Sequence, residues 1–252
     1  MDDMLVTTEG AVRTITLNRP DKRNALNDSL VGGLKTALQT ADADDSIRSV
    51  VIRGEGKDFC SGADLSALQR IAGASYEENL EDAQNLAELF AMPRKMKVPV
   101  IAAVHGRALA GGCGLATACD IVLATESARF GYPEVKIGFV PAIVTAFLRR
   151  NVSEKRAFEL LTRGFEFTAQ EANFLGLVNR IYPEEGFENA VLEYASLYSK
   201  LSASAVRLTK ALLYRIDNVG FDDSIAIGSE VNAEARMTED CQKGITKFLN
   251  RE

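Results

Sequence analysis

Two glycine-containing segments have the residue types needed to present backbone N–H groups to an anion. The first, Ser61-Gly62-Ala63-Asp64-Leu65, follows a short apolar run, and Gly62 permits a sharp turn into a helix. Amide groups at such a turn lack partners within the helix and can donate hydrogen bonds to an anion. On this motif alone the default interpretation is a plain strand-to-helix turn, with Asp64 as an acidic residue of the first helical turn.

The second segment runs from His105 to Leu115 and has Gly111, Gly112 and Gly114 at the start of an apolar helix. Glycines at a helix start allow a ligand to approach the backbone closely. A dinucleotide fingerprint is not matched, because Thr117 occupies the place of its third glycine, and no Gly-Lys-Ser/Thr follows for a P-loop. A helix start that binds an oxyanion fits as well or better, whereas close packing against a strand is the structural alternative.

One acidic residue stands among apolar neighbours. Glu134 follows a proline and precedes VKIGFVPAIV, and a carboxyl in such surroundings should have a raised pKa suited to proton transfer near neutrality. The plain alternative is an exposed glutamate in the first turn of a helix. His105 precedes the glycines and is interpreted as a packed or surface residue. Arg19, Lys22 and Arg23 form a small basic cluster, either a solvated loop or a phosphate contact.

The composition excludes several classes of protein. The 252 residues are 46% hydrophobic and 25% charged, which is typical of a globular chain with a sizeable core. A net charge of −6 argues against a nucleic-acid partner, and no apolar run is long enough to span a membrane. The four cysteines form no CxxC pair and only one histidine is present, so we predict no metal site, free thiols and a cytoplasmic location. The acidic N-terminus has no long apolar run, and we expect no leader segment.

The elements that must position these residues alternate between strands and helices. We predict strands over residues 12–17, 49–53, 98–104 and 121–124, with helices over 27–40, capped by Asn24, and 76–92. This alternation indicates an α/β fold. After residue 153 helical patterns dominate, apart from a strand over 178–182, and four helices are expected at 190–200, 203–215, 221–237 and 239–249. The latter part indicates an attached helical subdomain or an oligomerisation element.

Taken together, five stretches resemble the crotonase family, which contains enoyl-CoA hydratases, enoyl-CoA isomerases and relatives. They are NRPDKRNAL, FCSGADLSAL, VPVIAAVHGRALAGGCGLATACDIVLA, ARFGYPEVKIGFVP and TEDCQKGITKFL, in an order and spacing that also fit. The resemblance implies a ClpP-like spiral of ββα units over residues 1–190, carrying the active site. Residues 191–252 would form a helical trimerisation region, and the protein would be a homotrimer or a hexamer built as a dimer of trimers.

The resemblance also implies roles for individual residues. The N–H groups of Ala63 and Gly111 would form an oxyanion hole for the thioester oxygen of an acyl-CoA, and Glu134 would exchange protons with the acyl group. The residues that contact the substrate would be Lys22, Arg23, Ala25, Ala63, Asp64, Leu65, Ser66, Leu68, Gly111, Gly114 and Phe139. Coenzyme A would be part of the substrate, so no separate cofactor is expected. Lys247 and Arg251 could contact the coenzyme A of a neighbouring subunit.

The sequence departs from the two-acid pattern of many similar hydratases at Gly114, where they carry an acidic residue besides the one at the position of Glu134. The remaining acid could take a proton from water that attacks C3, as a hydratase, or carry a proton between C2 and C4, as a Δ3,Δ2-enoyl-CoA isomerase. Ala142 and Ile143, together with Gly114, look more like the methylglutaconyl-CoA hydratases, with room at Gly114 for a branched or carboxylated acyl group. We therefore predict a hydratase/dehydratase; a non-catalytic acyl-CoA-binding protein is the third possibility.

Overall fold

A six-stranded sheet organises most of the chain, in the order β1-β2-β3-β4-β6-β9. In this computed structural model, which describes residues 2–250 without the side chains of Leu65 and Leu68, β1 and β2 pair as an antiparallel hairpin and the other neighbours pair in parallel. The strands are β1 (Met4–Glu9), β2 (Val12–Leu17), β3 (Ser49–Gly54), β4 (Val100–Val104), β6 (Ile121–Thr125) and β9 (Arg180–Tyr182).

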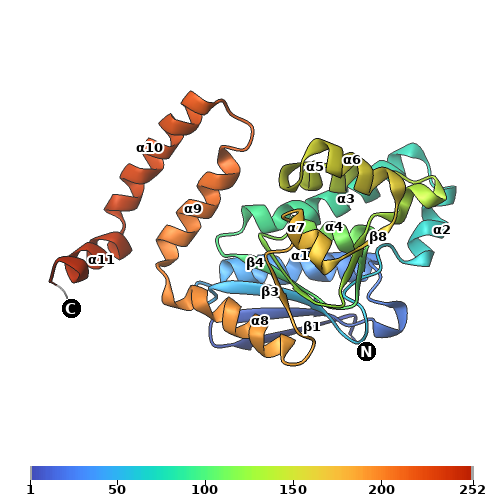
Figure 1. Cartoon of the computed structure of the whole chain (residues 1–252), viewed down its shortest axis with the longest axis horizontal. Coiled ribbons are helices and arrows are strands. Elements are labelled where there is room, and N and C mark those ends of the chain that lie inside the picture. The colour runs from blue at the N-terminus through green and yellow to red at the C-terminus, as the bar shows by residue number, and fades with distance from the viewer. Residues whose placement is uncertain (1, 251–252) are drawn as a thin grey trace.

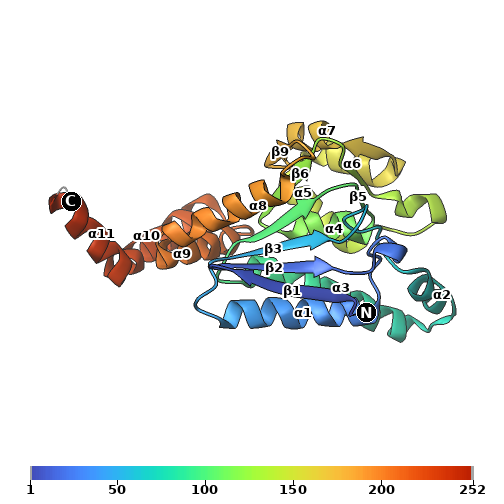
Figure 2. The ribbon, with the colours of Figure 1, turned by 90° about the horizontal axis from the view of Figure 1, so that it is seen from below.

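Helices cover both faces of this sheet (Figure 2). On one face lie α1 (Asp28–Ala43) and α3 (Tyr76–Lys95), and on the other lies α8 (Phe187–Ser196), followed by the 3-10 turn η3 (Leu197–Lys200). Successive strand residues point to opposite faces, so Ile52 joins the larger hydrophobic cluster and Val51 the cluster beneath α8. Every residue of β4 is buried, which explains the continuous apolar run in its sequence.

A second, three-stranded sheet stands beside the first and carries the segments of chemical interest. Its order is β5-β7-β8, formed by β5 (Arg107–Leu109), β7 (Arg129–Gly131) and β8 (Glu166–Thr168). The helical segments around it are η1 (Pro20–Lys22), α2 (Leu65–Gly73), α4 (Gly111–Ala118), η2 (Pro133–Ile137), α5 (Ala142–Asn151), α6 (Glu154–Arg163) and α7 (Ala169–Phe174). Because β5 leads into α4 and β7 leads into η2, this sheet brings the glycine segment and the glutamate segment together.

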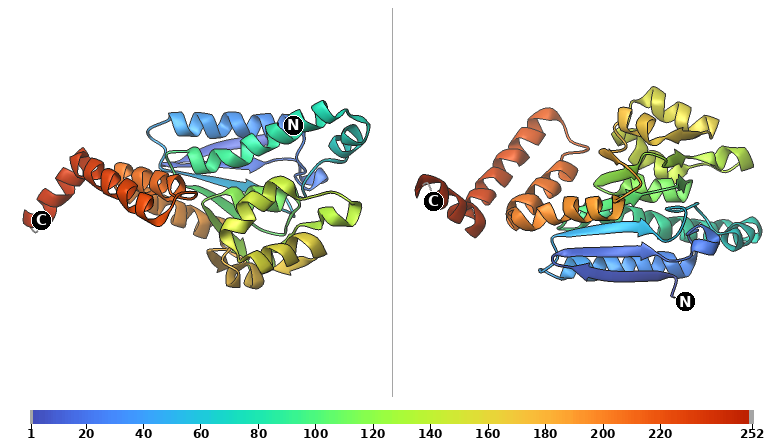
Figure 3. Two further views of the ribbon diagram at one scale, coloured as in Figure 1. Left: turned by 90° about the horizontal axis from the view of Figure 1, so that it is seen from above. Right: turned by 60° about the horizontal axis from the view of Figure 1, so that its bottom comes forward.

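Three C-terminal helices project from the core as an arm (Figures 1 and 3). They are α9 (Ala203–Arg215), α10 (Phe221–Met237) and α11 (Glu239–Asn250). Helix α9 is tied into the core through Lys210 Nζ, which donates to Asp120 Oδ2 at 2.6 Å. Neither α10 nor the described part of α11 buries a residue, and Phe221 and Phe248 are largely exposed.

Most predicted elements are present, and the α/β prediction is confirmed. The prediction that Asn24 caps the first helix is wrong. Asn27 is the cap and accepts from Leu30 N at 2.9 Å, whereas Asn24 is fully buried and donates to the carbonyl oxygens of Glu55 and Asp58. Strand β1 and the short strands of the second sheet were not predicted. Strand β1 is exposed along nearly its whole length, so its sequence shows no apolar alternation, and three-residue strands carry too little periodicity to recognise.

The structure also bears on several expected absences. The four cysteines are free thiols, as predicted. Within residues 2–250, no helix combines the length and apolarity needed to cross a membrane. The same part of the chain contains no group of three or more histidine, cysteine and acidic side chains arranged to hold a metal ion.

Candidate active site

The two glycine-containing segments lie side by side. Phe59 N donates to His105 O at 3.0 Å, Cys60 N donates to Arg107 O at 3.1 Å, and Leu109 N donates back to Cys60 O at 2.9 Å. These bonds hold the loop that leads to Ala63 along β5, so both segments reach their turns at the same place. The sequence predicts each turn by itself, but not that the two turns are neighbours.

At this meeting point the two backbones are in van der Waals contact. Gly62 has a φ of +97°, and a Cβ there would lie 2.7 Å from the Cβ of Ala110 and 3.3 Å from the nitrogen of Gly111. Ala110 itself has a φ of +48°, a conformation that costs a non-glycine residue about 1–3 kcal/mol. Among the described residues, no backbone oxygen accepts from the N–H of Ala63 or of Gly111. Two free donors therefore flank the contact between the turns.

A third loop clamps the first turn. Ser61 N donates to Arg23 O at 3.0 Å, Leu26 N donates to Gly62 O at 2.7 Å, and Asp64 N donates to Leu26 O at 2.9 Å. Ala63 lies between the bonded residues, with its own N–H left over. The clamp thus fixes the direction of that amide without using its hydrogen.

Asp64 is committed to holding this arrangement. Its carboxylate caps α2, accepting from Ser66 N at 2.9 Å and Ser66 Oγ at 2.8 Å, and its other oxygen lies 2.8 Å from Arg19 Nη2. The hydrogen bonds from Ser66, with a further contribution from Arg19, lower the pKa of Asp64 to about 2. Asp64 therefore stands at the start of α2, one residue before the first helical turn predicted for it. Arg19 pairs with Asp64 and is not a solvated cation.

The remaining basic residues of the cluster face solvent. Lys22 and Arg23 are exposed, whereas Ala25 is buried behind them. Both cations belong to the loop that clamps Ala63, and the carbonyl of Arg23 accepts from Ser61 N, two residues before the free amide. The predicted phosphate contact stays a prediction.

Glu134 occupies η2, directly after β7. Its side chain is half-buried, and its Oε2 is buried without a hydrogen-bond partner among the described residues. Burial raises the pKa of Glu134, opposed by a weaker backbone hydrogen bond. The loop behind it is fixed, because Phe139 N donates to Glu134 O at 3.0 Å. Glu134 does stand in the first helical turn after a proline, as the plain alternative predicted, but it is half-buried and not exposed.

A buried hydroxyl pair joins the glutamate segment to α4. Tyr132 is fully buried, and its hydroxyl lies 2.8 Å from Thr117 Oγ1, which also bonds the carbonyl of Cys113 at 2.8 Å. Tyr132 precedes Pro133 and Glu134, and Thr117 belongs to the helix that begins at Gly111. Sequence analysis missed this pair, since nothing in the spacing of two residues 15 positions apart indicates contact.

The space beside Gly114 is filled. A Cβ at Gly114 would lie 2.4 Å from Cγ2 of Val144 and 2.8 Å from Cε2 of Phe90. The expectation that this glycine leaves room for part of an acyl group is therefore wrong, because α3 and α5 supply side chains that occupy the place. Apolar side chains pack directly against Gly114, so no free space remains where its side chain would be.

Other predicted contact residues are less constrained. Ser66 is exposed apart from its bond to Asp64, and Phe139 is 47% exposed, next to the more exposed Val140. Lys247 is exposed on α11. Arg251 and the side chains of Leu65 and Leu68 lie outside the described residues.

A separate cavity of about 600 Å³ lies between the sheet and α8, and its lining includes His105, Arg53 and Glu188. Several of the polar groups that line it are already engaged. Arg53 pairs with Glu188, and the ring nitrogen Nε2 of His105 donates to the Gly56 carbonyl at 2.9 Å. None of Ala63, Gly111 and Glu134 lines this cavity, so it is a feature apart from the candidate site.

Sequence comparison identifies relatives along nearly the whole chain. The family model for enoyl-CoA hydratase/isomerase matches residues 7–252. A Thermus thermophilus relative that carries an enoyl-CoA hydratase name is 41% identical over 248 residues, covering 98% of each chain. The 2,3-dehydroadipyl-CoA hydratase of Escherichia coli K12 is 35% identical over 252 residues, covering 100% of this chain and 97% of the relative.

Solved structures with the same fold also carry enoyl-CoA hydratase names. The enoyl-CoA hydratase of Mycobacterium smegmatis superposes with a TM-score of 0.94 at 33% identity, over 99% of this chain and 97% of that one. The human enoyl coenzyme A hydratase domain-containing protein 3 also gives a TM-score of 0.94, at 30% identity over 99% and 98% of the two chains. The predicted family resemblance is confirmed: the chain belongs to the enoyl-CoA hydratase/isomerase family, the crotonases, and is an enzyme with the crotonase fold.

Proposed function

We propose that the protein is an enoyl-CoA hydratase that adds water across the C2=C3 bond of an acyl-CoA thioester with Glu134 as its single acid–base residue. The observation that carries the proposal is the buried, unpartnered oxygen of Glu134, on an element bonded to the helix that begins with the free Gly111 amide. A carboxyl left without a partner in a protein interior is costly, and such groups are concentrated at functional sites.

The two amides would act on the thioester oxygen. When water attacks C3, the electron pair of the double bond moves toward the carbonyl, and negative charge develops on its oxygen. The N–H groups of Ala63 and Gly111 would donate to that oxygen, and the positive end of α4 adds to the stabilisation. Losing one donor of this kind typically costs about 2.7–4 kcal/mol of transition-state stabilisation.

Glu134 would then act twice in one turnover. As a carboxylate it takes a proton from water while the water oxygen bonds to C3. As a carboxylic acid it returns that proton to C2 while the carbonyl reforms, which restores the carboxylate. One group is sufficient for the net addition, and because burial raises the pKa of Glu134, returning the proton is less costly to prepare than for an ordinary glutamate.

Coenzyme A enters as part of the substrate. Lys22 and Arg23, exposed on the clamping loop, would contact its phosphates, and no separate cofactor is required. For the acyl group we propose a branched or carboxylated chain, resembling methylglutaconyl-CoA. The name of the Escherichia coli relative, 2,3-dehydroadipyl-CoA hydratase, supports a carboxylated one. Exposed apolar residues of α10 and α11, Phe221 and Phe248 among them, support assembly into a homotrimer or hexamer.

Because no second acid fits at position 114, isomerisation is the second candidate reaction. Isomerisation of a Δ3-enoyl-CoA to the Δ2 form requires only one base that moves a proton between C2 and C4, and no second acid can stand at position 114 without displacing Val144. Both reactions would use the same amides and the same glutamate.

Three substrates separate the possibilities. With crotonyl-CoA or 3-methylglutaconyl-CoA, loss of the conjugated-enoyl absorbance would report hydration. With 3-hexenoyl-CoA, appearance of that absorbance would report isomerisation. We expect hydration, abolished in Glu134→Gln and retained in Glu126→Gln, a matched change at an exposed glutamate. Tight acyl-CoA binding with no turnover of any substrate would instead identify a binding protein.

A further inference from the structure

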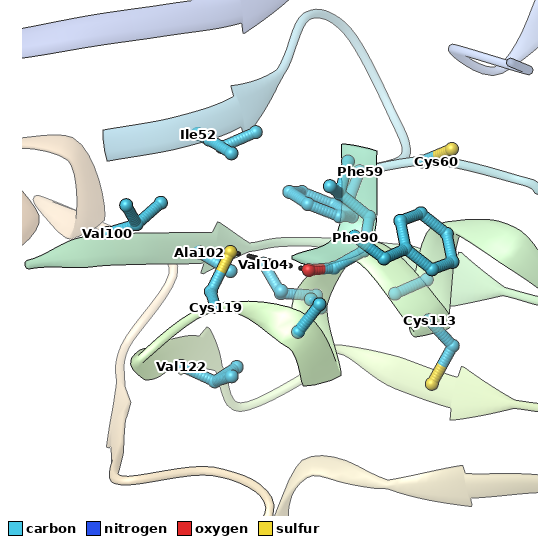
Figure 4. Packing of buried hydrophobic residues seen from close by; sticks show 14 of the residues in the cluster. Ile52, Phe59, Cys60, Phe90, Val100, Ala102, Val104, Cys113, Cys119 and Val122 are labelled. Carbon is cyan, nitrogen blue, oxygen red and sulfur yellow. Dashed lines mark hydrogen bonds between the residues drawn. The ribbon is translucent and has the colours of Figure 1, made fainter. Parts of the chain in front are cut away.

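The wall of the candidate site at Gly114 is built from three elements. Gly114 lies three residues after Gly111, on the same face of α4. Val144 of α5, 4% exposed, and Phe90 of α3, fully buried, pack against it. Phe90 is held in turn by Phe147, whose ring meets it edge-on with centroids 6.3 Å apart. Figure 4 shows Phe90 among other side chains of the larger hydrophobic cluster, such as Phe59 and Val104.

The contacts at Gly114 are too short for any side chain. A Cβ there would stand 2.4 Å from Val144 Cγ2 and 2.8 and 3.3 Å from two ring atoms of Phe90. The obstructing atoms cannot simply turn away. Val144 is β-branched and has one strongly preferred rotamer in a helix, and Phe90 is enclosed by the core.

Gly112, also in α4, is obstructed in the same way by the backbone of Cys60, but the glycines of the other helices are not. Gly32 in α1 and Gly228 in α10 have no atom within 4 Å of a Cβ position. At such sites alanine is the better helix former, so glycine is a tolerated choice. At Gly114 glycine is required by what α3 and α5 place against it.

We propose that Val144 is a specificity-determining residue: with Phe90 it closes the α4 wall at Gly114, which keeps a second acid out of the site and limits the size of acyl group that fits against α4. The proposal rests on the proposed function, since it assumes that the acyl group lies along the first turns of α4. It also explains why this chain has glycine at 114 together with valine at 144. An acidic side chain at 114 would collide with Val144.

A double-mutant cycle of thermal stability tests, without an activity assay, whether Val144 obstructs position 114. Gly114→Ala adds only the obstructed Cβ, and we expect Tm to fall by about 3–10 °C, although alanine is the better helix former. Gly32→Ala, the matched control, should raise Tm slightly. Val144→Ala removes the contacting methyl, so the loss in Gly114→Ala/Val144→Ala should be clearly smaller than the sum of the two single losses. A Gly114→Ala protein as stable as wild type, or additive losses, would overturn the proposal.

An acyl-size series tests the specificity. Val144→Ala should raise the ratio of kcat/KM for 2-octenoyl-CoA to kcat/KM for crotonyl-CoA by about tenfold, as expected when room for a small apolar group is added to a binding pocket. Gly32→Ala should leave that ratio unchanged. An unchanged ratio in Val144→Ala would overturn the specificity role even if the stability cycle succeeds. If wild type hydrates neither of these thioesters nor 3-methylglutaconyl-CoA, the proposed function fails, and the stability cycle still tests whether Val144 and Phe90 obstruct position 114.

Discussion

Two half-buried carboxyl groups of this protein have opposite surroundings. Asp120, at the junction between the core and α9, accepts from Lys210 Nζ at 2.6 Å, Tyr214 Oη at 2.6 Å and Val100 N at 2.7 Å. Glu134, in η2, has a buried oxygen that accepts from nothing among the described residues. The first carboxylate is saturated with donors, and the second is kept available.

The number of hydrogen-bond partners distinguishes a carboxyl group that stabilises the fold from one that can react. A carboxylate that is fully bonded has no capacity left for a substrate, and it stabilises the fold only while its partners remain. A carboxyl without partners is a cost to the fold, and the same lack of partners leaves it free to exchange protons. Aspartate and glutamate have nearly the same chemistry, so their surroundings decide which role each performs.

The largest effect is expected from Glu134→Gln. The amide keeps the shape of the side chain but cannot accept a proton from water, so the rate of hydration should fall by about 10²–10⁴-fold. Acyl-CoA binding should remain close to wild type, measured by titration calorimetry on the same preparation. Turnover that survives this substitution would show that another group is the base.

Asp120→Asn should damage the fold instead. It leaves the Lys210 ammonium buried beside a neutral partner, and breaking a buried pair in this way costs about 3–5 kcal/mol. Burial already lowers the pKa of Lys210, and loss of the Asp120 charge would lower it further. Denaturant unfolding measures the loss.

Asp28→Asn is the matched control for that experiment, since Asp28 pairs with Arg70 at 2.8 Å on the surface. Exposed pairs contribute about 0–1 kcal/mol, so its unfolding midpoint should barely move. Equal losses in the two variants would mean that the Asp120 junction is no more important than a surface ion pair.

A smaller effect is expected from Tyr132→Phe, which removes the hydroxyl that joins the Glu134 segment to α4. A buried hydrogen bond contributes about 0.5–1.5 kcal/mol, so stability should fall modestly. If the bond also positions Glu134, kcat should fall severalfold while KM stays constant. A loss of stability with an unchanged kcat would show that the pair only packs the core.

The smallest effect is the change in stability expected from Glu134→Gln, and its sign is opposite to that of Asp120→Asn. The pKa of Glu134 is raised above its usual 4.5 in the folded protein, so this group favours folding below that pH and opposes it as pH rises through the folded pKa. Glu134→Gln should therefore raise Tm at pH 8, and the gain should disappear below pH 4.5. Asp120→Asn should lower Tm at pH 8. A Glu134→Gln protein less stable than wild type at pH 8 would contradict the unpartnered carboxyl.

The same free carboxyl predicts an acid limit to activity. Hydration begins with Glu134 as a carboxylate, so the rate should fall as pH drops through its raised pKa, at a higher pH than an ordinary glutamate would give. A pH–rate profile of kcat/KM measures this pKa. An acid limb at or below pH 4.5 would indicate that burial does not control this group.

Local patterns in the sequence predicted a large part of this molecule. Alternating and continuous apolar runs indicated strands β2, β3 and β4, and the periodicity of the last helices matched α9 and α10 at both ends. The glycines around position 111 and the glutamate after a proline indicated the candidate amides and acid. Each of these signals lies within about a dozen residues, the range over which backbone preferences and periodicity operate.

The rest depends on which distant segments meet. The sequence could not show that Asn24 is buried against residues 55–58, that Tyr132 bonds Thr117, or that Val144 and Phe90 fill the space at Gly114. The sequence suggested free space at Gly114 because the side chains that fill this space, Phe90 and Val144, lie 24 and 30 residues away along the chain. Chain order determines the local conformations, but a side chain's partners, and therefore its pKa and its room, are set only when the packed core brings those helices together.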